Sequence, residues 1–490
     1  METTPKTVFQ TRFFCALFFL TLVSLTLVTQ PYAIIRDGDT GWHLAAGHDI
    51  LTRGHVPTTD PFSYTAQDYP WMNLAWGWDA LATLIEQAGG LYAVCAFSVL
   101  LYALGVALAG AMAITTRSRF FAVCLWMIPI LPVLLNAVYA RPGVVAGVLG
   151  LILLWLIQSP RRSLWGTCML SACIGAAWVN LHGSFPVAFT LFAAYGGAAL
   201  IRHDWPAVTA ITAMTVSYSL GLCLNPYGWQ VITAILLTLQ GNSQQMISEW
   251  ASPFASPETR WMVVPLLLMA ALYLYRWHAI SLAEHLLFVF WAIAACVSWR
   301  YLPLALLLNF PTSAKQITPL IEQWQTRYPS LLREELHRVE QWLSHKPIPR
   351  LLWLIPLLPV IGGGFLHANE RPARYAELEP IIAAIDRHAC HPLLNHYDVG
   401  GDIIYLTHAR IPVFVDSRAE TAYPASVIAD ALRLHRHPVQ AERLAAKYQA
   451  ELILLPSYAT APEGWREEAM SASYTLYGSP DLTRCPPHRD

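Results

Sequence analysis

Long uninterrupted apolar runs constrain this chain more than any other feature of its sequence. A helix needs about 20 mostly apolar residues to cross a bilayer, and fewer when it lies inside a bundle. Only 13% of the 490 residues are charged, against about 25% in an average soluble domain, and the net charge of −1 offers no basic excess for binding nucleic acid. The runs predict about eleven transmembrane helices, at 13–34, 91–114, 119–139, 143–158, 164–180, 185–201, 206–224, 261–276, 281–297, 300–312 and 350–367.

The basic residues between these runs predict the orientation. Run 13–34 is too long for a signal peptide and has no A-x-A cleavage site, so we expect an uncleaved first span with a cytoplasmic N-terminus. Arginine and lysine then gather in the cytoplasmic loops, above all in 313–349. This alternation works only if the short run 300–312 is a span. It divides the chain into a transmembrane domain, 1–367, with a first outer loop at 35–90, and an extracytoplasmic domain, 368–490.

The extracytoplasmic domain shows the pattern of a small α/β domain. Short β-like runs at 393–397, 411–416, 451–456 and 473–478 alternate with helical periodicity at 424–435 and 438–450. Asp416 and Arg418 follow one of the predicted strands, at the kind of strand end where α/β domains bind ligands. The alternative is that they form only a turn and a surface ion pair.

Two of the nine cysteines, Cys390 and Cys485, bracket this domain, whereas the others lie in or near the predicted spans. An oxidising compartment would allow the two to form a disulfide. The alternative is a pair of free thiols.

The first outer loop carries charges at the point where the chain leaves the bilayer. Asp37 and Asp39 stand two residues apart, so in an extended or turn segment their carboxylates can converge on one cation or one substrate hydroxyl. Residues 42–53, which include His43, and residues 76–88 are predicted to form helices at the membrane interface. The alternative is structural: either acid could cap the 42–53 helix or pair with Arg36.

This acidic pair, with the loop and helices around it, resembles the arrangement in GT-C-type membrane glycosyltransferases. A closer resemblance is to a largely uncharacterised bacterial inner-membrane family with a D-x-D-x-W-W-H-L-like first outer loop. Segments similar to that family run along nearly the whole chain: D-G-D-T-G-W-H-L (37–44), G-H-V-P-T-T-D-P-F-S-Y-T (54–65), W-V-N-L-H-G-S-F (178–185), N-P-Y-G (225–228), I-S-E-W-A-S-P (247–253), W-R-Y-L-P (299–303), N-H-Y-D-V-G-G (395–401) and P-V-F-V-D-S-R (412–418).

The chain departs from that family at two positions. Gly41 stands where the family usually has its first Trp, and Ala75 stands where it usually has Glu. That Glu would be a natural second acid for a GT-C site. Asp79 lies one helical turn further on and could take its place.

The predicted topology independently brings further polar residues to the outer face. Each has an ordinary explanation when taken alone, since an arginine can snorkel to the interface and Asn-Pro can be only a turn. Taken together with Asp37, Asp39 and His43, the set predicts a cavity that opens outward. The residues at the outer ends of predicted spans are Arg141, His182, Asn225, Glu249 and Arg300.

The resemblance implies a sugar transfer from a polyprenyl-phosphate-linked donor to an extracytoplasmic glycan, lipid or protein acceptor in the bacterial inner membrane. Asp37 or Asp39 would act as general base, His43 would orient that acid or contact the phosphate, and Arg141 and Arg300 would bind the donor phosphate. The acceptor would lie against His182, Asn225, Glu249 and Asp79, and Asp416 and Arg418 would cover the cavity or present the acceptor. A divalent cation between Asp37 and Asp39 is compatible with this chemistry but not required by it.

Two other classes of function stay open at this point. The protein could be a transport or non-catalytic component of an envelope polysaccharide assembly system. A transporter would be expected to carry charges at mid-bilayer and broken helices in matched halves, which the sequence does not display. It could also be another enzyme acting on lipid phosphates, although no phosphate-loop or Ser-His-Asp signature supports this.

Overall fold

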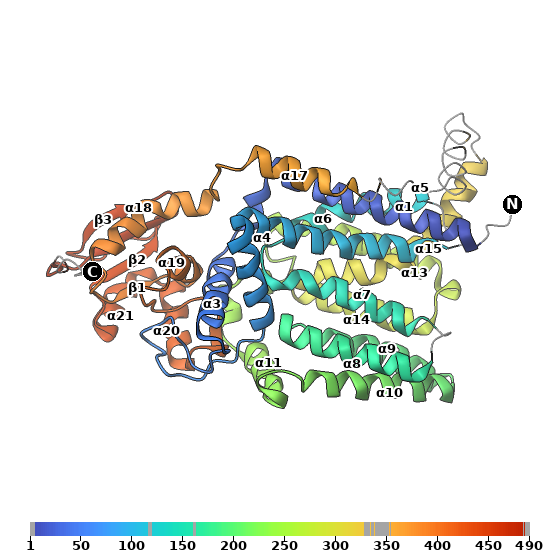
Figure 1. The fold of residues 1–490 in the computed structure, drawn as a ribbon, viewed down its shortest axis with the longest axis horizontal. Helices are drawn as coiled ribbons and strands as arrows, with labels where there is room; N and C mark the ends of the chain where they lie inside the picture. The colour runs from blue at the N-terminus through green and yellow to red at the C-terminus, as the bar shows by residue number, and fades with distance from the viewer. Residues whose placement is uncertain are drawn as a thin grey trace.

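The computed structural model describes residues 5–115, 120–159, 163–327 and 354–483, together with Glu334, Arg338, Leu352 and Cys485. Long helices run side by side in one body, and an α/β domain lies at one end of it (Figure 1). Helix α17 (Leu357–Leu366) runs along the bundle beside α1 and α2 and leads the chain into that domain.

The helical body corresponds to the predicted transmembrane domain. Its helices are α1 (Pro5–Ser24), α2 (Thr26–Thr29), the second part of α4 (Trp76–Ala113), α5 (Phe120–Met127), α6 (Leu131–Asn136), α7 (Val145–Ile157), α8 (Leu164–Leu181), α9 (Val187–Ile201), α10 (Trp205–Leu222), α13 (Val264–Tyr275), α14 (Leu282–Val297), α15 (Leu302–Arg327) and α17. Within the described ranges, three helical segments are long and apolar enough to cross a membrane by length and composition: Val8–Thr29, Trp76–Ala113 and Leu164–Leu181. Shorter apolar helices cover several other predicted spans, and the total of eleven stays a prediction.

Two of the predicted spans have different bounds in the structure. Run 119–139 is not one helix but two, because Pro129 and Pro132 each remove a backbone donor and disfavour helix before them. Run 300–312 does not end at 312, since α15 continues to Arg327 with two prolines inside it. Beyond that residue, Glu334 and Arg338 are the described residues of the predicted loop 313–349; its other residues there lie outside the described part of the chain.

The first outer loop forms a layer between the bundle and the α/β domain (Figure 1). Helix α3 (Asp39–Arg53) ends at Gly54, whose φ of 73° is the left-handed conformation that glycine adopts readily. The first part of α4 lies beside α3, and the helix kinks at Gly89 and Gly90 before entering the bundle. The structure therefore confirms that both segments, 42–53 and 76–88, are helical, and their place at the membrane interface stays a prediction.

The α/β domain is built on a four-stranded sheet with strand order β1-β2-β4-β3. Strand β1 (Leu393–Asn395) is parallel to β2 (Leu452–Pro456), and β4 (Tyr474–Gly478) runs antiparallel to β2 and to β3 (Arg466–Met470). The domain's helices are α18 (Ala373–Arg387), α19 (Gly400–Leu406), α20 (Ala425–Arg436) and α21 (Ala441–Tyr448). Strand β3 was not predicted, because its polar edge-strand sequence, REEAM, carries no apolar alternation.

The predicted strand 411–416 is wrong. In place of a continuous strand, Val413 forms single β-bridges to Leu393 of β1 and to Ser63 of the first outer loop; its backbone donates to Phe62 O and accepts from Tyr64 N. On the sheet side, the Asn395 side chain accepts from Phe414 N and so takes the place of a ladder bond. The segment therefore joins the α/β domain to the first outer loop.

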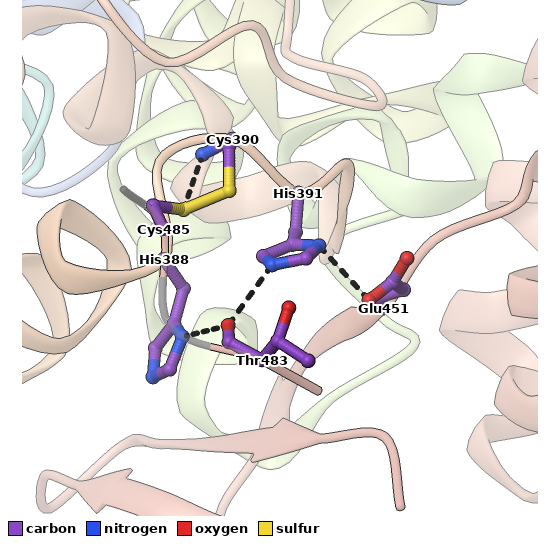
Figure 2. The surroundings of a disulfide bond; sticks show 6 residues. All are labelled: His388, Cys390, His391, Glu451, Thr483 and Cys485. Carbon is purple, nitrogen blue, oxygen red and sulfur yellow. Dashed lines mark hydrogen bonds and ion pairs between the residues drawn. A yellow bond between two sulfur atoms is a disulfide. The ribbon is translucent and has the colours of Figure 1, made fainter. Parts of the chain in front are cut away.

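A disulfide joins Cys390 and Cys485, as one of the two alternatives predicted. Figure 2 shows that His388 and His391 both contact the Thr483 carbonyl oxygen, at 3.4 and 3.0 Å. The disulfide and these contacts hold the C-terminal tail against the end of α18.

Candidate active site between the bundle and the outer domain

Arg141 connects three acidic side chains from separate parts of the chain. It lies in the turn between α6 and the short helix η2 (Pro142–Val144), and only 13% of its side chain is exposed. Its Nη1 donates to Asp37 Oδ2 at 2.9 Å and to Asp39 Oδ2 at 2.7 Å, and its Nη2 donates to Glu249 Oε1. The acidic pair of the first outer loop therefore converges, as predicted, but on a guanidinium group of the protein itself.

Glu249 links this group to the second predicted arginine. Its other oxygen, Oε2, accepts from Arg300 Nη1 at 3.0 Å, and Ser298 Oγ donates to the Glu249 backbone oxygen at 2.8 Å. Arg300 keeps a third of its side chain exposed. Among the described contacts, Arg300 thus has one carboxylate partner where Arg141 has three, which leaves Arg300 more capacity to bind an added anion.

Asp37 and Asp39 differ in pKa, in a network where three carboxylates share two guanidinium groups. Burial and the charge of Asp39 raise the pKa of Asp37 to about 7, although a third of its side chain still meets solvent. Burial also acts to raise the pKa of Asp39, but Arg141, His43 and the Ser417 hydroxyl together lower it to about 2. Asp37 is therefore tuned to exchange a proton near neutral pH, whereas Asp39 stays ionised.

The α/β domain, which we also call the outer domain, supplies a hydrogen-bond partner to Asp39. Ser417 Oγ donates to Asp39 Oδ1, and Trp42 Nε1 lies 3.3 Å from the same oxygen. Ser417 is held between Asp416 and Arg418, whose side chains form an ion pair at 2.6 Å.

That ion pair is buried and not on the surface, so the surface alternative considered for it is wrong. Arg418 also donates to Asp60 of the first outer loop at 2.6 Å, and none of these three side chains is exposed. The guanidinium group lies 4.7 Å from the Trp71 ring centroid. Arg418 therefore joins the outer domain to the loop that carries Asp37 and Asp39.

His43 is oriented by Asp79. Its Nδ1 lies 2.6 Å from Asp79 Oδ1, and Asn73 Nδ2 donates to the other oxygen of that acid at 2.7 Å. His43 lines the cavity described below, whereas Asp79 is fully buried behind it and is not among the lining residues. Asp79 can therefore position His43 but does not contact a ligand in the cavity.

Two cavities meet at this ion network. One of about 340 Å³ lies between the bundle and the outer domain, and its polar lining includes Asp39, His43, His182, Arg300 and Ser417. The other, of about 160 Å³, extends into the bundle and is lined by Glu249 with apolar side chains of α15. Arg141 and Arg300 border both cavities. A ligand that extended from one cavity into the other would therefore pass these two side chains.

Of the two remaining predicted site residues, His182 lines the cavity and Asn225 does not. His182 Nδ1 lies 2.7 Å from Ser184 Oγ, and burial together with the nearby Arg300 lowers the pKa of His182 to about 3, so it is neutral in the cavity wall. Asn225 is not brought to the site. Its side chain donates to Leu222 O and Gly228 O, which is the turn that we considered as its alternative.

The position between Asp37 and Asp39 does not fit a divalent cation in this arrangement. Arg141 Nη1 contacts both carboxylates and already occupies the place that a shared cation would take. Asp37 Oδ1 also accepts from the backbone N–H of Asp39, the first residue of α3, but the N-cap of this helix is Gly38 and neither aspartate caps it. Arg36 pairs with neither acid in the described contacts; it donates to Ala33 O and to Asn136.

Sequence reasoning missed two residues that shape the site. Tyr139 lies under the Arg141 guanidinium group, 4.2 Å from its ring centroid, and Asn73 holds Asp79. Tyr139 stands two residues before Arg141, so the alternation of an extended segment was the available signal. Asn73 belongs to the N-x-A-W segment in which the family Glu is replaced by Ala75.

No family model matches this sequence, and no curated protein matches it. Among solved structures, ArnT from Cupriavidus metallidurans bound to undecaprenyl phosphate matches with a TM-score of 0.50 at 11% identity, over 94% of this chain and 96% of that chain. The apo form of the same protein matches with a TM-score of 0.50 at 13% identity, over 95% and 98%. An oligosaccharyltransferase from Archaeoglobus fulgidus matches with a TM-score of 0.49 at 10% identity, over 90% of this chain and 69% of that chain.

The match to ArnT extends over both the helical body and the outer domain, because nearly the whole of each chain is covered. The chain therefore has the fold of the GT-C-type membrane glycosyltransferases, as its sequence resemblance predicted.

Proposed function

We propose that this protein is a membrane glycosyltransferase that moves a sugar from a polyprenyl-phosphate-linked donor to an acceptor on the outer side of the membrane. The observation that carries the proposal is the ion network at the cavity between bundle and outer domain. There, Asp39 lines the cavity, and Asp37, whose pKa is raised to about 7, shares the Arg141 guanidinium group with it; the same network holds Arg300, which has room for an anion. The ArnT structure that shares the fold binds undecaprenyl phosphate, which supports a lipid phosphate as part of the donor.

In the proposed reaction, Asp37 accepts the proton of the acceptor hydroxyl as its oxygen attacks the anomeric carbon of the sugar. The bond between that carbon and the phosphate oxygen breaks, and the polyprenyl phosphate leaves with the electron pair. Arg300 neutralises the charge that develops on the leaving phosphate. Arg141, which donates to three carboxylates, positions the base, so the phosphate role expected for it passes to Arg300.

The outer domain has a defined part in this proposal. Ser417 holds Asp39, and Asp39 helps to raise the pKa of Asp37. His43 and His182 would contact the sugar or the acceptor from the cavity wall. The protein would lie in the bacterial inner membrane, with the α/β domain on the periplasmic side.

The test uses the full-length protein in nanodiscs with a panel of polyprenyl-phosphate sugars, and it measures released polyprenyl phosphate. We expect release with at least one donor, lost in Asp37→Asn and strongly reduced in Arg300→Ala. Arg466→Ala is the matched control, because Arg466 is an exposed arginine on edge strand β3.

Thermal unfolding of each variant would confirm that it folds. Release that is equal in wild type and the folded Asp37→Asn variant would refute the catalytic assignment. No release from any donor, combined with a full cellular defect on deletion of residues 370–490, would favour the assembly-component alternative.

A further inference from the structure

A second cluster of ligand-type side chains lies in the outer domain, away from the ion network. His396 follows strand β1, Asp398 stands in the short helix η10 (Tyr397–Val399), and His435 lies in the last turn of α20. One nitrogen or oxygen atom from each of these residues lies within 4.8 Å of the other two. His396 and Asp398 belong to the N-H-Y-D-V-G-G segment, which the proposed sugar transfer does not use.

The two imidazole rings face each other with their nitrogens. Nδ1 of His435 lies 3.1 Å from His396 Nε2, and the ring centroids are 5.1 Å apart. Two nitrogen ligands of a tetrahedral zinc ion, each about 2.0–2.1 Å from the metal, lie about 3.3 Å from one another. The observed separation therefore needs only a small adjustment to hold an ion between the rings.

The third group is close enough to complete such a site. Asp398 Oδ2 lies 3.6 Å from Nδ1, the other ring nitrogen of His396, so its carboxylate must rotate to reach an ion held at Nε2; its side chain is about half exposed, which allows this rotation. His396 is 97% buried, and it is fixed by its backbone bond to Leu454 O. An ion could therefore reach the buried His396 from solvent by way of the half-exposed carboxylate of Asp398.

A neutral pair of histidines can share only one proton between the two facing nitrogens. A metal ion would replace that proton and accept a lone pair from each nitrogen, while the carboxylate offsets part of its charge. Two imidazoles and one carboxylate leave a fourth position open for water or a ligand, as in zinc sites that are not purely structural.

We propose that His396, Asp398 and His435 bind a zinc ion in the outer domain. The ion would connect the end of β1 to α20, on the side of the domain where parallel strands end. The cysteine-containing cluster of Cys390, His391 and Cys485 is not a rival site in this state, because its two sulfur atoms are bonded to each other.

The experiment titrates Zn²⁺ into the full-length protein, purified without a histidine tag and treated with chelator, and follows both the heat of binding and the unfolding temperature. We expect one saturable site per chain and a higher unfolding temperature with zinc, because binding to the folded state stabilises it. His435→Gln, at a half-buried position of α20, should lose at least about 100-fold in affinity, the upper end of what even an outer-shell change costs a metal site.

His437→Gln is the matched control, since this exposed histidine stands two residues further along the same helix end and outside the cluster. Asp398→Asn is a second variant, on a half-exposed side chain, that should weaken zinc without unfolding the domain. The proposal is wrong if wild type shows no saturable binding, or if His435→Gln and Asp398→Asn bind zinc as tightly as the control. It does not depend on the transferase reaction, so either can fail alone.

Discussion

The contact between the first outer loop and the outer domain should be broken by a single methyl group at Gly401. Helix α3 approaches α19 so closely that a Cβ at Gly401 would lie 2.0 Å from Gly38 O and 3.1 Å from the Trp42 ring. The obstacle is a backbone carbonyl, which cannot rotate away as a side chain would. The same contact explains Gly41, because a Cβ there would lie 2.5 Å from Gly401 O, and the family's Trp could not be accommodated.

The expected cost follows from two opposing terms. Replacing glycine by alanine inside a helix gains about 1 kcal/mol from backbone entropy, whereas overpacking a close contact costs about 1–3 kcal/mol. Gly362 in α17 is a matched control, since a Cβ there meets no atom within 4 Å. Gly362→Ala should therefore be neutral or slightly stabilising, and Gly401→Ala should be less stable than that control by about 1–3 kcal/mol.

The assay is thermal unfolding of both variants in the same detergent, together with limited proteolysis of the outer domain. Gly401→Ala should unfold several degrees below Gly362→Ala, and its outer domain should be cleaved sooner because α19 is pushed away from α3. Equal unfolding temperatures with unchanged cleavage would show that the two helices are not packed as closely as the structure places them.

Three further predictions address charge and covalent links. Arg418→Met should destabilise the protein by about 3–5 kcal/mol, because it leaves the buried carboxylates of Asp60 and Asp416 without their cationic partner; chemical denaturation checks this, and a loss below 1 kcal/mol would contradict it. Cys390→Ser should cost about 2–4 kcal/mol, since the disulfide closes a loop with a sequence separation of 95 residues, and a reductant should lower the unfolding temperature of wild type but not of the variant. Transferase activity should rise as the pH increases through about 7, because the pKa of Asp37 is raised from 3.8 to about 7 and only the ionised form accepts a proton; a rate that is flat between pH 5 and pH 9 would remove Asp37 as the base.

The sign of the linked stability effect for Asp37 is opposite to that of an ordinary salt-bridged acid. Its folded-state pKa lies above the unfolded value of 3.8, so the folded protein binds this proton more tightly. The stability that this group contributes is present at low pH and is lost as the pH rises through about 7. Keeping Asp37 near its pKa thus costs stability at the pH where it is useful as a base.

The sequence allowed the site to be located but not its pairings to be assigned. Alternation of apolar runs placed Arg141, Glu249 and Arg300 on one face of the membrane together with Asp37 and Asp39. Which arginine has free capacity depends on distances between segments 51 to 108 residues apart, and the structure gives Arg141 three carboxylate partners and Arg300 one. Local pattern carries no information on such distances.

Asn225 and Arg418 show the same limit in opposite directions. Asn225 looked like part of the cavity because of its topological position, but its amide is used by its own turn. Arg418 was predicted to stand at a strand end, either at a ligand site or in a surface ion pair, but the segment before it pairs with the first outer loop and the arginine is buried. In both cases the position of the residue depends on a hydrogen-bond partner that a hydropathy pattern does not predict.

The sequence by itself determined the helical body, the two helices of the first outer loop and most strands of the α/β domain, because these follow from hydropathy and periodicity within short windows. Only the tertiary structure decided that Asp39 is held by Ser417, that Gly41 faces Gly401, and that the acidic pair is closed by an arginine and not by a cation. The physical reason is that charge neutralisation and close packing are properties of atoms brought together by folding. Where acidic side chains outnumber their basic partners, any of them could have the raised pKa. Only the fold decides that it is Asp37 and not Asp39.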